Sequence, residues 1–270
     1  MATVLIGFAA FVFIIDFPDK VLNSNRPFLT KTELEIVKFR IDKDRKDSEA
    51  DAITWATARK HLTDWTLWMY ALLFMSCAMP AYAFAYFLPI ILKEGMGYST
   101  QMSQLLSTPP YFAGVIVALA VSRWADKTRL RAPFIAVSTI VTIVGLTLTA
   151  YAIQSNGARY LGAFLGITGL AVSVPACLAY QSNNVRTHSK RSVSSALQIG
   201  FGSIGGIIAS TVFRQEDSPR YMPGIWTSIG FQLLILVIIT VMSVYYKSEN
   251  RKQKEQGKIL EGSEGFRYTY

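Results

Sequence analysis

Six long apolar stretches between Trp65 and Tyr246 dominate the pattern of hydrophobic and polar positions. A helix rises about 1.5 Å per residue, so about 20 apolar residues cross a hydrocarbon core of about 30 Å. Backbone groups find no hydrogen-bond partner in lipid, and such stretches must therefore be helical. The predicted fold is all-α, a polytopic membrane bundle of six full helices plus a truncated one. The expected spans are Trp65–Leu92, Met102–Val121, Pro133–Ala152, Arg159–Ser182, Val193–Phe213 and Trp226–Tyr246.

The pattern divides the chain into four parts. Residues 1–15 are apolar but too few to span a bilayer, so they predict a truncated transmembrane helix. Residues 16–64 form a polar linker, residues 65–246 the six-helix lobe, and residues 247–270 a polar tail that we expect to be disordered.

Two short helices are predicted in the linker. Thr30 and Glu33 form a capping-box pattern before an amphipathic helix that carries Leu34, Val37 and Ile41 at helical spacing. Thr54–Leu62 predicts a second short helix that leads into the first full span.

Charge then sets the orientation. The net charge is +9, and the loops Ser122–Ala132 and Asn183–Ser192 are strongly basic, whereas the alternate loops are nearly neutral. Basic residues in every second short loop mark the cytoplasmic side, so the linker and the tail are also expected there. This pattern differs from the basic surface patch of a nucleic-acid-binding protein. We expect an integral membrane protein with no nucleic-acid partner, in the plasma membrane.

The sequence gives little support for cofactor or enzyme chemistry. Cys77 and Cys177 lie in apolar stretches without metal or disulfide spacing, and we interpret both as reduced packing residues. His61 and His188 have no partner at metal-binding spacing and are interpreted as solvated surface residues. A membrane enzyme would need clustered acids, histidines or a nucleophile beside a base, and none is visible. We therefore expect no metal, no cofactor and no catalytic residue.

Several motifs resemble one known family. They are Phe87–Leu92, Gln104–Tyr111, Ala125–Arg131, Gly200–Gly206 and Asp217–Gly224. Together they resemble the C-terminal half of a major facilitator superfamily transporter. Within that superfamily the chain is most similar to the fungal anion:cation symporter branch, which includes allantoate and nicotinate permeases. Tyr180 stands where that branch usually carries a tryptophan, and Ser122 stands where the loop motif usually opens with glycine.

The resemblance implies a secondary active transporter, or a truncated part of one, for a small organic anion or vitamin such as nicotinate or allantoate. Proton coupling and alternating access are the expected mechanism, and residues 16–64 become the cytoplasmic linker between two lobes. The expected partners are the substrate, a proton, the lipid bilayer and either a missing N-terminal lobe or a second copy. The alternatives are a non-transporting, receptor-like or regulatory membrane protein, and an inactive half-transporter fragment.

Polar stripes on four spans are the candidates for the substrate cavity, because transporter sites lie near the bilayer midplane where lobes meet. Charged residues are absent from the middle of every span, which predicts that the countercharge and proton site lie in the other lobe. The alternative for each polar residue is an ordinary hydrogen bond between helices. The candidates are Met79, Tyr82, Tyr86, Thr108, Tyr111, Ser173, Tyr180, Asn184 and Gln198.

Charged residues in the two basic loops are the candidates for a cytoplasmic gate. A charge cluster that fastens neighbouring helix ends can stabilise one access state and break in the other. The alternative is a simple topology signal, because any basic loop would provide that. The spacings of Gly162 with Gly166 and of Gly202 with Gly206 predict close helix packing or a hinge rather than ligand binding. The gate candidates are Asp126, Arg129, Arg131, Lys190 and Arg191.

Overall fold

The computed structural model describes residues 2–14, 29–44, 53–152, 154–218, 220–262 and 265–270. The chain divides into two units, Met1–Glu49 and Ala50–Tyr270. The predicted side-chain role of Ile41 lies outside what the structure describes.

The first unit contains two helices, α1 (Ala2–Phe13) and α2 (Lys31–Asp44). The capping box predicted before α2 is confirmed: the Thr30 amide donates to Glu33 Oε2 at 2.9 Å, and the Glu33 amide donates to Thr30 Oγ1 at 3.4 Å. These two bonds satisfy free amides at the start of α2, which explains why the helix begins there.

The second unit holds the lobe. Its α3 is the predicted short helix, and six long helices follow, each apolar and long enough to cross a membrane. These six match the predicted spans in order and position, which confirms the all-α expectation. Its elements are α3 (Trp55–Leu62), α4 (Trp65–Ile90), the π-helical turn η2 (Ile91–Gly95), α5 (Thr100–Thr128), α6 (Ala132–Tyr151), α7 (Asn156–Asn184), α8 (His188–Val212), the 3₁₀ turn η3 (Gln215–Asp217) and α9 (Met222–Gln256).

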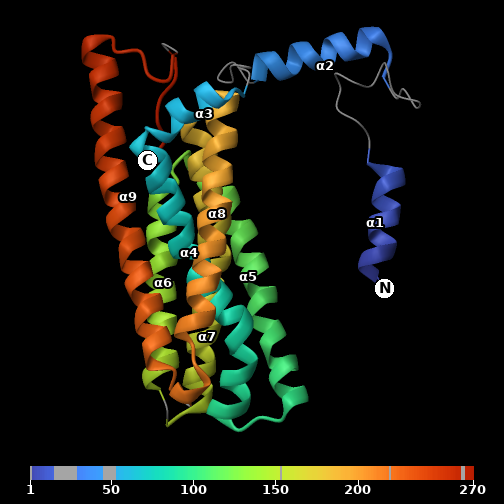
Figure 1. Ribbon diagram of the computed structural model, residues 1–270, viewed down its shortest axis with the longest axis vertical. Coiled ribbons are helices and arrows are strands. Elements are labelled where there is room, and N and C mark those ends of the chain that lie inside the picture. The colour runs from blue at the N-terminus through green and yellow to red at the C-terminus, as the bar shows by residue number, and fades with distance from the viewer. Residues whose placement is uncertain (1, 15–28, 45–52, 153, 219, 263–264) are drawn as a thin grey trace. The chain divides into compact units, whose positions relative to one another are not determined.

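The long helices run side by side and alternate in direction (Figure 1). Helix α4 packs against α8 and α9, and α7 packs against α5 and α6. Helices α5 and α8 are the least covered: only 11% and 22% of their most apolar windows are buried, against 44% to 56% in the other four. We call the end that carries α3 and the first turn of α8 the basic end, and the end that carries η2 the opposite end.

The closest helix contact joins α6 to α7 through glycines. A Cβ added at Gly145 would lie 2.3 Å from the Gly166 backbone nitrogen and 2.6 Å from the Gly162 carbonyl oxygen. Only glycine permits this separation, because backbone atoms cannot move aside as a flexible side chain can. The predicted packing role of the Gly162 and Gly166 spacing is therefore confirmed.

The tail differs from expectation. Helix α9 continues to Gln256, ten residues beyond the predicted span, and much of the segment after it packs against the basic end. Leu260 is 3% exposed and Phe266 is 8% exposed. The expectation of a disordered tail is wrong for the described residues, because apolar side chains scattered through a polar sequence find partners on the lobe.

Candidate functional site

A pocket between three helices lies on the side of the lobe where α5 is sparsely covered. It has a volume of about 250 Å³ and is lined by Phe84 of α4, Tyr111 of α5 and five residues from Ile167 to Pro175 of α7, together with Ala81. Tyr111 is 41% exposed. The structure therefore brings one of the predicted cavity residues to the edge of a real apolar pocket with aromatic walls.

Two other predicted cavity residues stack on each other. The rings of Tyr82 and Tyr86 lie 5.9 Å apart with an interplanar angle of 21°, and both side chains are well exposed. The ring of Tyr82 lies against Gly206 of α8, where an added Cβ would meet it at 3.1 Å. Thr108 is also exposed. These residues are accessible to a ligand or to a second lobe.

Five predicted cavity residues are buried inside the lobe instead, and three of them, Met79, Ser173 and Tyr180, contact neighbouring helices. The hydroxyls of Ser173 and Ser138 are 2.8 Å apart across the α6–α7 contact, and Met79 Sδ accepts a hydrogen bond from Ser228 at 3.5 Å. Tyr180 packs edge-on against Tyr70 and Tyr246. In this structure these three residues pack between helices and do not line a cavity.

Gln198 is different. It is fully buried in α8, yet neither its amide nitrogen nor its carbonyl oxygen has a hydrogen-bond partner within the described residues. Ser194, one turn earlier on the same buried face, also lacks a partner for its hydroxyl among those residues. Burying unpaired polar groups is costly, so a water or a ligand that reached these two side chains would relieve that cost.

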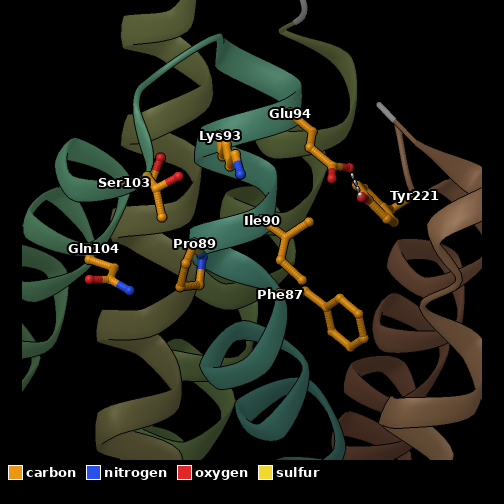
Figure 2. A pocket seen from close by; sticks show the side chains of 9 residues that line it. Phe87, Pro89, Ile90, Lys93, Glu94, Ser103, Gln104 and Tyr221 are labelled. Carbon is orange, nitrogen blue, oxygen red and sulfur yellow. Dashed lines mark hydrogen bonds between the residues drawn. The ribbon is translucent and has the colours of Figure 1, made fainter.

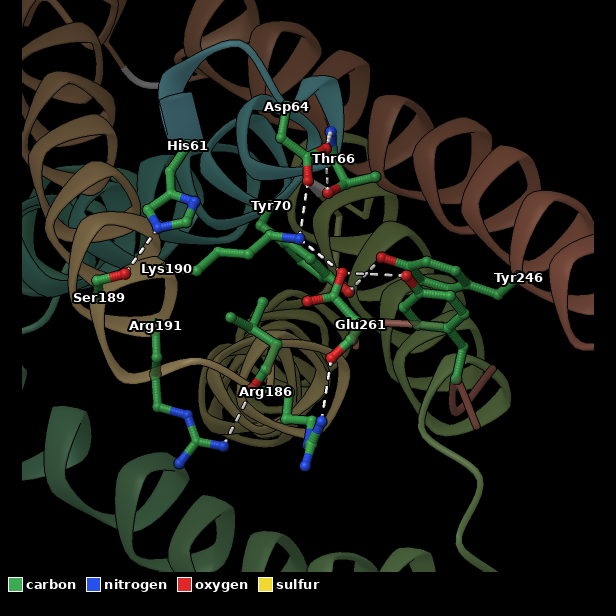
Figure 3. A network of polar contacts seen from close by, with 12 residues as sticks. His61, Asp64, Thr66, Tyr70, Arg186, Ser189, Lys190, Arg191, Tyr246 and Glu261 are labelled. Atoms are coloured by element: carbon green, nitrogen blue, oxygen red, sulfur yellow. Dashed lines mark hydrogen bonds and ion pairs between the residues drawn. The ribbon is translucent and has the colours of Figure 1, made fainter. Parts of the chain in front are cut away.

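Lys190 is the centre of the basic end (Figure 3). Its ammonium nitrogen lies 2.8 Å from Asp64 Oδ2 and 2.6 Å from Glu261 Oε1, and the lysine is only 9% exposed. This cluster joins the residue that caps α4, the first turn of α8 and the tail. Burial opposes ionisation of Asp64, but the hydrogen bond and charge of Lys190, together with the hydrogen bonds from Thr66, hold the pKa of that carboxyl below its ordinary value.

The neighbours of this cluster are tied to the tail or to the end of α7. Arg186 donates to the Glu261 carbonyl at 3.2 Å, and Arg191 donates to the carbonyls of Ser182 and Val185 at 3.0 and 3.1 Å. His61 Nε2 lies 2.7 Å from the Ser189 hydroxyl oxygen. The interpretation of His61 as a solvated surface residue is therefore wrong, because α3 packs on the first turn of α8.

The side-chain amides of Asn184 and Asn250 form hydrogen bonds with the backbone of the tail. Asn184 accepts from the Thr269 amide at 2.7 Å and donates to its carbonyl at 3.1 Å. Asn250 makes the same pair of bonds with Tyr268, at 2.9 and 2.8 Å. The Tyr268 ring stacks on Tyr246 with centroids 4.4 Å apart, and burial raises the pKa of its phenol. The predicted cavity residue Asn184 is thus occupied by the tail.

The basic loop Ser122–Ala132 gives a smaller cluster. Arg131 pairs with Asp126, which joins the end of α5 to the start of α6. Arg129 has a left-handed backbone with φ of 54° at the end of α5, and it makes no ion pair within the described part of the chain. Two of the three charged residues predicted here are therefore brought together.

Sequence reasoning missed Asp64, Glu261 and the tail contacts. The pairing of Lys190 with Glu261 joins residues 71 positions apart, and neither motif nor spacing connects them. No group of three or more His, Cys, Asp or Glu side chains among the described residues is arranged to hold a metal ion.

The family profile described as Major Facilitator Superfamily matches residues 1–210. The chain belongs to the major facilitator superfamily. This membership agrees with the six apolar helices and makes the chain an integral membrane protein of a transporter family.

Several fungal members of the superfamily are similar to this chain. The high-affinity nicotinic acid transporter of Saccharomyces cerevisiae is 28% identical over 227 residues, which cover 84% of this chain and 42% of that protein. A major facilitator-type transporter of Emericella nidulans is 29% identical, covering 87% and 48%. An uncharacterized transporter of Schizosaccharomyces pombe is also 29% identical, covering 88% and 47%. The chain spans about half the length of the curated relatives it matches, and no solved structure matches it significantly.

Proposed function

We propose that this chain is the C-terminal lobe of a secondary active transporter for a small organic anion or vitamin such as nicotinate. In this proposal the carrier lies in the plasma membrane, couples uptake to protons and works by alternating access. The pocket between α4, α5 and α7 carries the proposal, because it lies on the sparsely covered side of a transporter lobe and has aromatic walls at Phe84 and Tyr111. The nicotinic acid transporter among the relatives supports the substrate class.

The chemistry of this half-site is neutral. The pocket lining offers stacking and apolar contact. Gln198 and Ser194 of α8 do not line this pocket; they are fully buried polar groups without a partner among the described residues. None of the described residues that line this pocket is charged. An anion therefore needs its countercharge from the facing lobe, and we assign the proton site to that lobe for the same reason.

The charged clusters at the basic end supply the gate in this proposal. The Asp64–Lys190–Glu261 cluster and the Asp126–Arg131 pair each join helix ends that alternating access must separate or shift. Rigid-body rocking of one lobe against another commonly repacks such ion pairs. We therefore expect them to be intact in one access state and broken in the other.

Uptake by yeast cells that express the chain, alone and joined to an N-terminal lobe, tests the function. Radiolabelled nicotinate, allantoate, pantothenate and biotin are offered at pH 5 and pH 7, and one of them should accumulate faster at pH 5 in the two-lobe form. Tyr111→Ala should raise the apparent KM about fivefold, because an aromatic contact contributes about 1 kcal/mol. Phe112→Ala is the control, since Phe112 is 68% exposed and does not line the pocket.

Two results would contradict the proposal. Binding of one of these compounds without net uptake in the two-lobe form favours a receptor-like protein. Equal KM values for the Tyr111 variant and the unchanged protein would remove the pocket between α4, α5 and α7 from the substrate path.

A further inference from the structure

The tail after α9 is held mainly through its backbone. Asn184 bonds to both the amide and the carbonyl of Thr269, at 2.7 and 3.1 Å, and Asn250 bonds in the same way to Tyr268, at 2.9 and 2.8 Å. Gln253 donates to a third tail carbonyl, two residues before Tyr268, at 2.8 Å. A side-chain amide that pairs with both backbone groups of one residue imitates a neighbouring β-strand and accepts any side chain there. This surface therefore has the chemistry to bind an extended peptide.

Two side chains of the tail add selectivity. The ring of Tyr268 stacks on Tyr246, with centroids 4.4 Å apart. The Tyr268 hydroxyl donates to Glu261 Oε1 at 3.1 Å, and the same oxygen accepts from Lys190 at 2.6 Å (Figure 3). The surface thus selects an aromatic residue that follows an acidic residue by seven positions.

The backbone at Glu261 is strained. Its φ is 46°, a left-handed conformation that is costly for a residue with a side chain, and Gly262 follows with φ of 74°. Arg186 holds the Glu261 carbonyl at 3.2 Å while Lys190 holds the carboxylate. Strained residues persist only where their surroundings fix them, and they gather at switch regions. Losing either contact therefore lets this part of the tail relax away from the lobe.

The opposite end of the lobe is joined without such a segment. Beside a cavity of about 390 Å³, Glu94 of η2 accepts a hydrogen bond from Tyr221 at 3.0 Å (Figure 2). Arg159 of α7, only 2% exposed, donates to the carbonyls of Gly95 and Thr149 at 2.8 and 3.0 Å. These bonds join the helix ends directly. At the basic end the tail supplies part of the link, and it can leave without unfolding a helix, because its described residues after α9 belong to none.

We propose that the basic end carries a peptide-binding site, the tail seat, made of Asn184, Lys190, Tyr246, Asn250 and Gln253. The chain's own tail is its exchangeable ligand. While seated, the tail ties the ends of α7, α8 and α9 together and so inhibits opening of the basic end. That inhibition rests on the proposed function, whereas the peptide binding does not.

A fluorescein-labelled synthetic peptide with the sequence of residues 258–270 tests the seat, by anisotropy on the full chain in nanodiscs. Glu261→Lys in the chain empties the seat, because it opposes Lys190 with a like charge and leaves every seat residue unchanged. The peptide should bind this variant with a Kd below about 100 µM. It should bind the unchanged chain at least about tenfold more weakly, because the tethered tail competes at roughly millimolar effective concentration.

Variants of the emptied seat and of the peptide define the recognition. In the Glu261→Lys chain, Asn250→Ala should weaken binding about tenfold, because two hydrogen bonds to the peptide backbone are lost. Asn183→Ala, at an exposed position of α7 beside the seat, is the matched control and should leave binding unchanged. A peptide that carries Glu261→Lys should bind at least about tenfold more weakly than the unchanged peptide.

Three results would overturn the inference. The first is hydrogen exchange at the Thr269 amide that is no faster in Glu261→Lys than in the unchanged chain, which would show that Glu261 does not hold the tail. The second is a peptide that fails to bind once exchange shows the seat to be empty. The third is equal binding to the Asn250→Ala and Asn183→Ala variants.

Uptake tests the inhibition. In the two-lobe form, Glu261→Lys should raise the uptake rate at least about twofold, because an emptied seat no longer ties the helix ends. Unchanged or slower uptake beside normal peptide binding would contradict the inhibitory role. Absence of uptake in every form would contradict only the transport proposal, because peptide binding is measured without transport.

Discussion

The ammonium nitrogen of Lys190 lies 2.6 Å from Oε1 of Glu261, so a residue in the first turn of α8 is bound directly to the tail. The same nitrogen reaches Asp64, whose other carboxylate oxygen accepts the Thr66 amide and so caps α4. One buried cation thus links three segments that are distant in sequence. Removing it leaves two carboxylates without their partner, which is costly at such low exposure.

The first prediction concerns that cation. Lys190→Met should destabilise the docked tail by about 2–3 kcal/mol, since charge-assisted hydrogen bonds are lost. Hydrogen exchange of the amides of Tyr268 and Thr269, which are bonded to Asn250 and Asn184, should accelerate by about 30-fold or more. Lys254→Met, at an exposed position on α9, is the matched control. Unchanged exchange in the Lys190 variant would show that the ion pairs do not hold the tail.

The second prediction concerns pH. Lys190 lowers the pKa of Asp64 in the folded chain, so the stability that this carboxylate contributes is complete above its ordinary value of 3.8 and is lost as the pH falls through the lower folded value. The difference in unfolding free energy between the unchanged chain and Asp64→Asn should be constant from pH 7 to pH 5 and should shrink below pH 4. A difference that grows on acidification would contradict this assignment.

The third prediction concerns the contact between α6 and α7. Gly145→Ala should lower the unfolding free energy by about 1–3 kcal/mol, because its methyl group would meet backbone atoms of α7. Gly200→Ala, where an added Cβ meets nothing within 4 Å, should be neutral or slightly stabilising. Thermal unfolding in detergent compares the two, and equal melting temperatures would mean that the helices are farther apart than described.

The fourth prediction concerns the gate. In the two-lobe form, Asp126→Ala should reduce the rate of uptake several-fold without reducing membrane insertion, because Arg131 loses the partner that joins α5 to α6. Surface expression measured beside uptake separates the two effects. Normal uptake in this variant would contradict a gating role for Asp126 and Arg131. The basic loop would then only signal topology, which is the alternative that the sequence allows.

The membrane explains why the sequence predicts the lobe so well. Lipid offers the backbone no hydrogen-bond partner, so each apolar stretch must form a helix. Six spans can therefore be identified from length and hydropathy. The spacing of Gly162 and Gly166 likewise predicts close packing, but only the structure shows that the partner is Gly145 of α6.

The tail contacts and the burial of Arg159 were not predictable in the same way. Glu261 and Tyr268 lie in a polar segment, and their partners Lys190 and Tyr246 are supplied by helices distant in the chain. Arg159 sits at a helix end, where extension to the surface is the usual expectation, and only the fold shows that carbonyls of η2 and α6 bury it. Ser173 and Met79 were chosen by helical spacing alone, which cannot tell a cavity from a helix contact.

Cysteine labelling tests most directly the central claim, that this chain is a six-span lobe with Lys190 at the cytoplasmic end and Lys93 at the other. Cys77 and Cys177 are fully buried, so background labelling by a membrane-impermeant maleimide is low. In intact cells Gln101→Cys and Arg214→Cys should label, whereas Lys127→Cys and Ser192→Cys should label only after permeabilisation. Labelling of Gln101→Cys and Lys127→Cys from the same side would contradict the account.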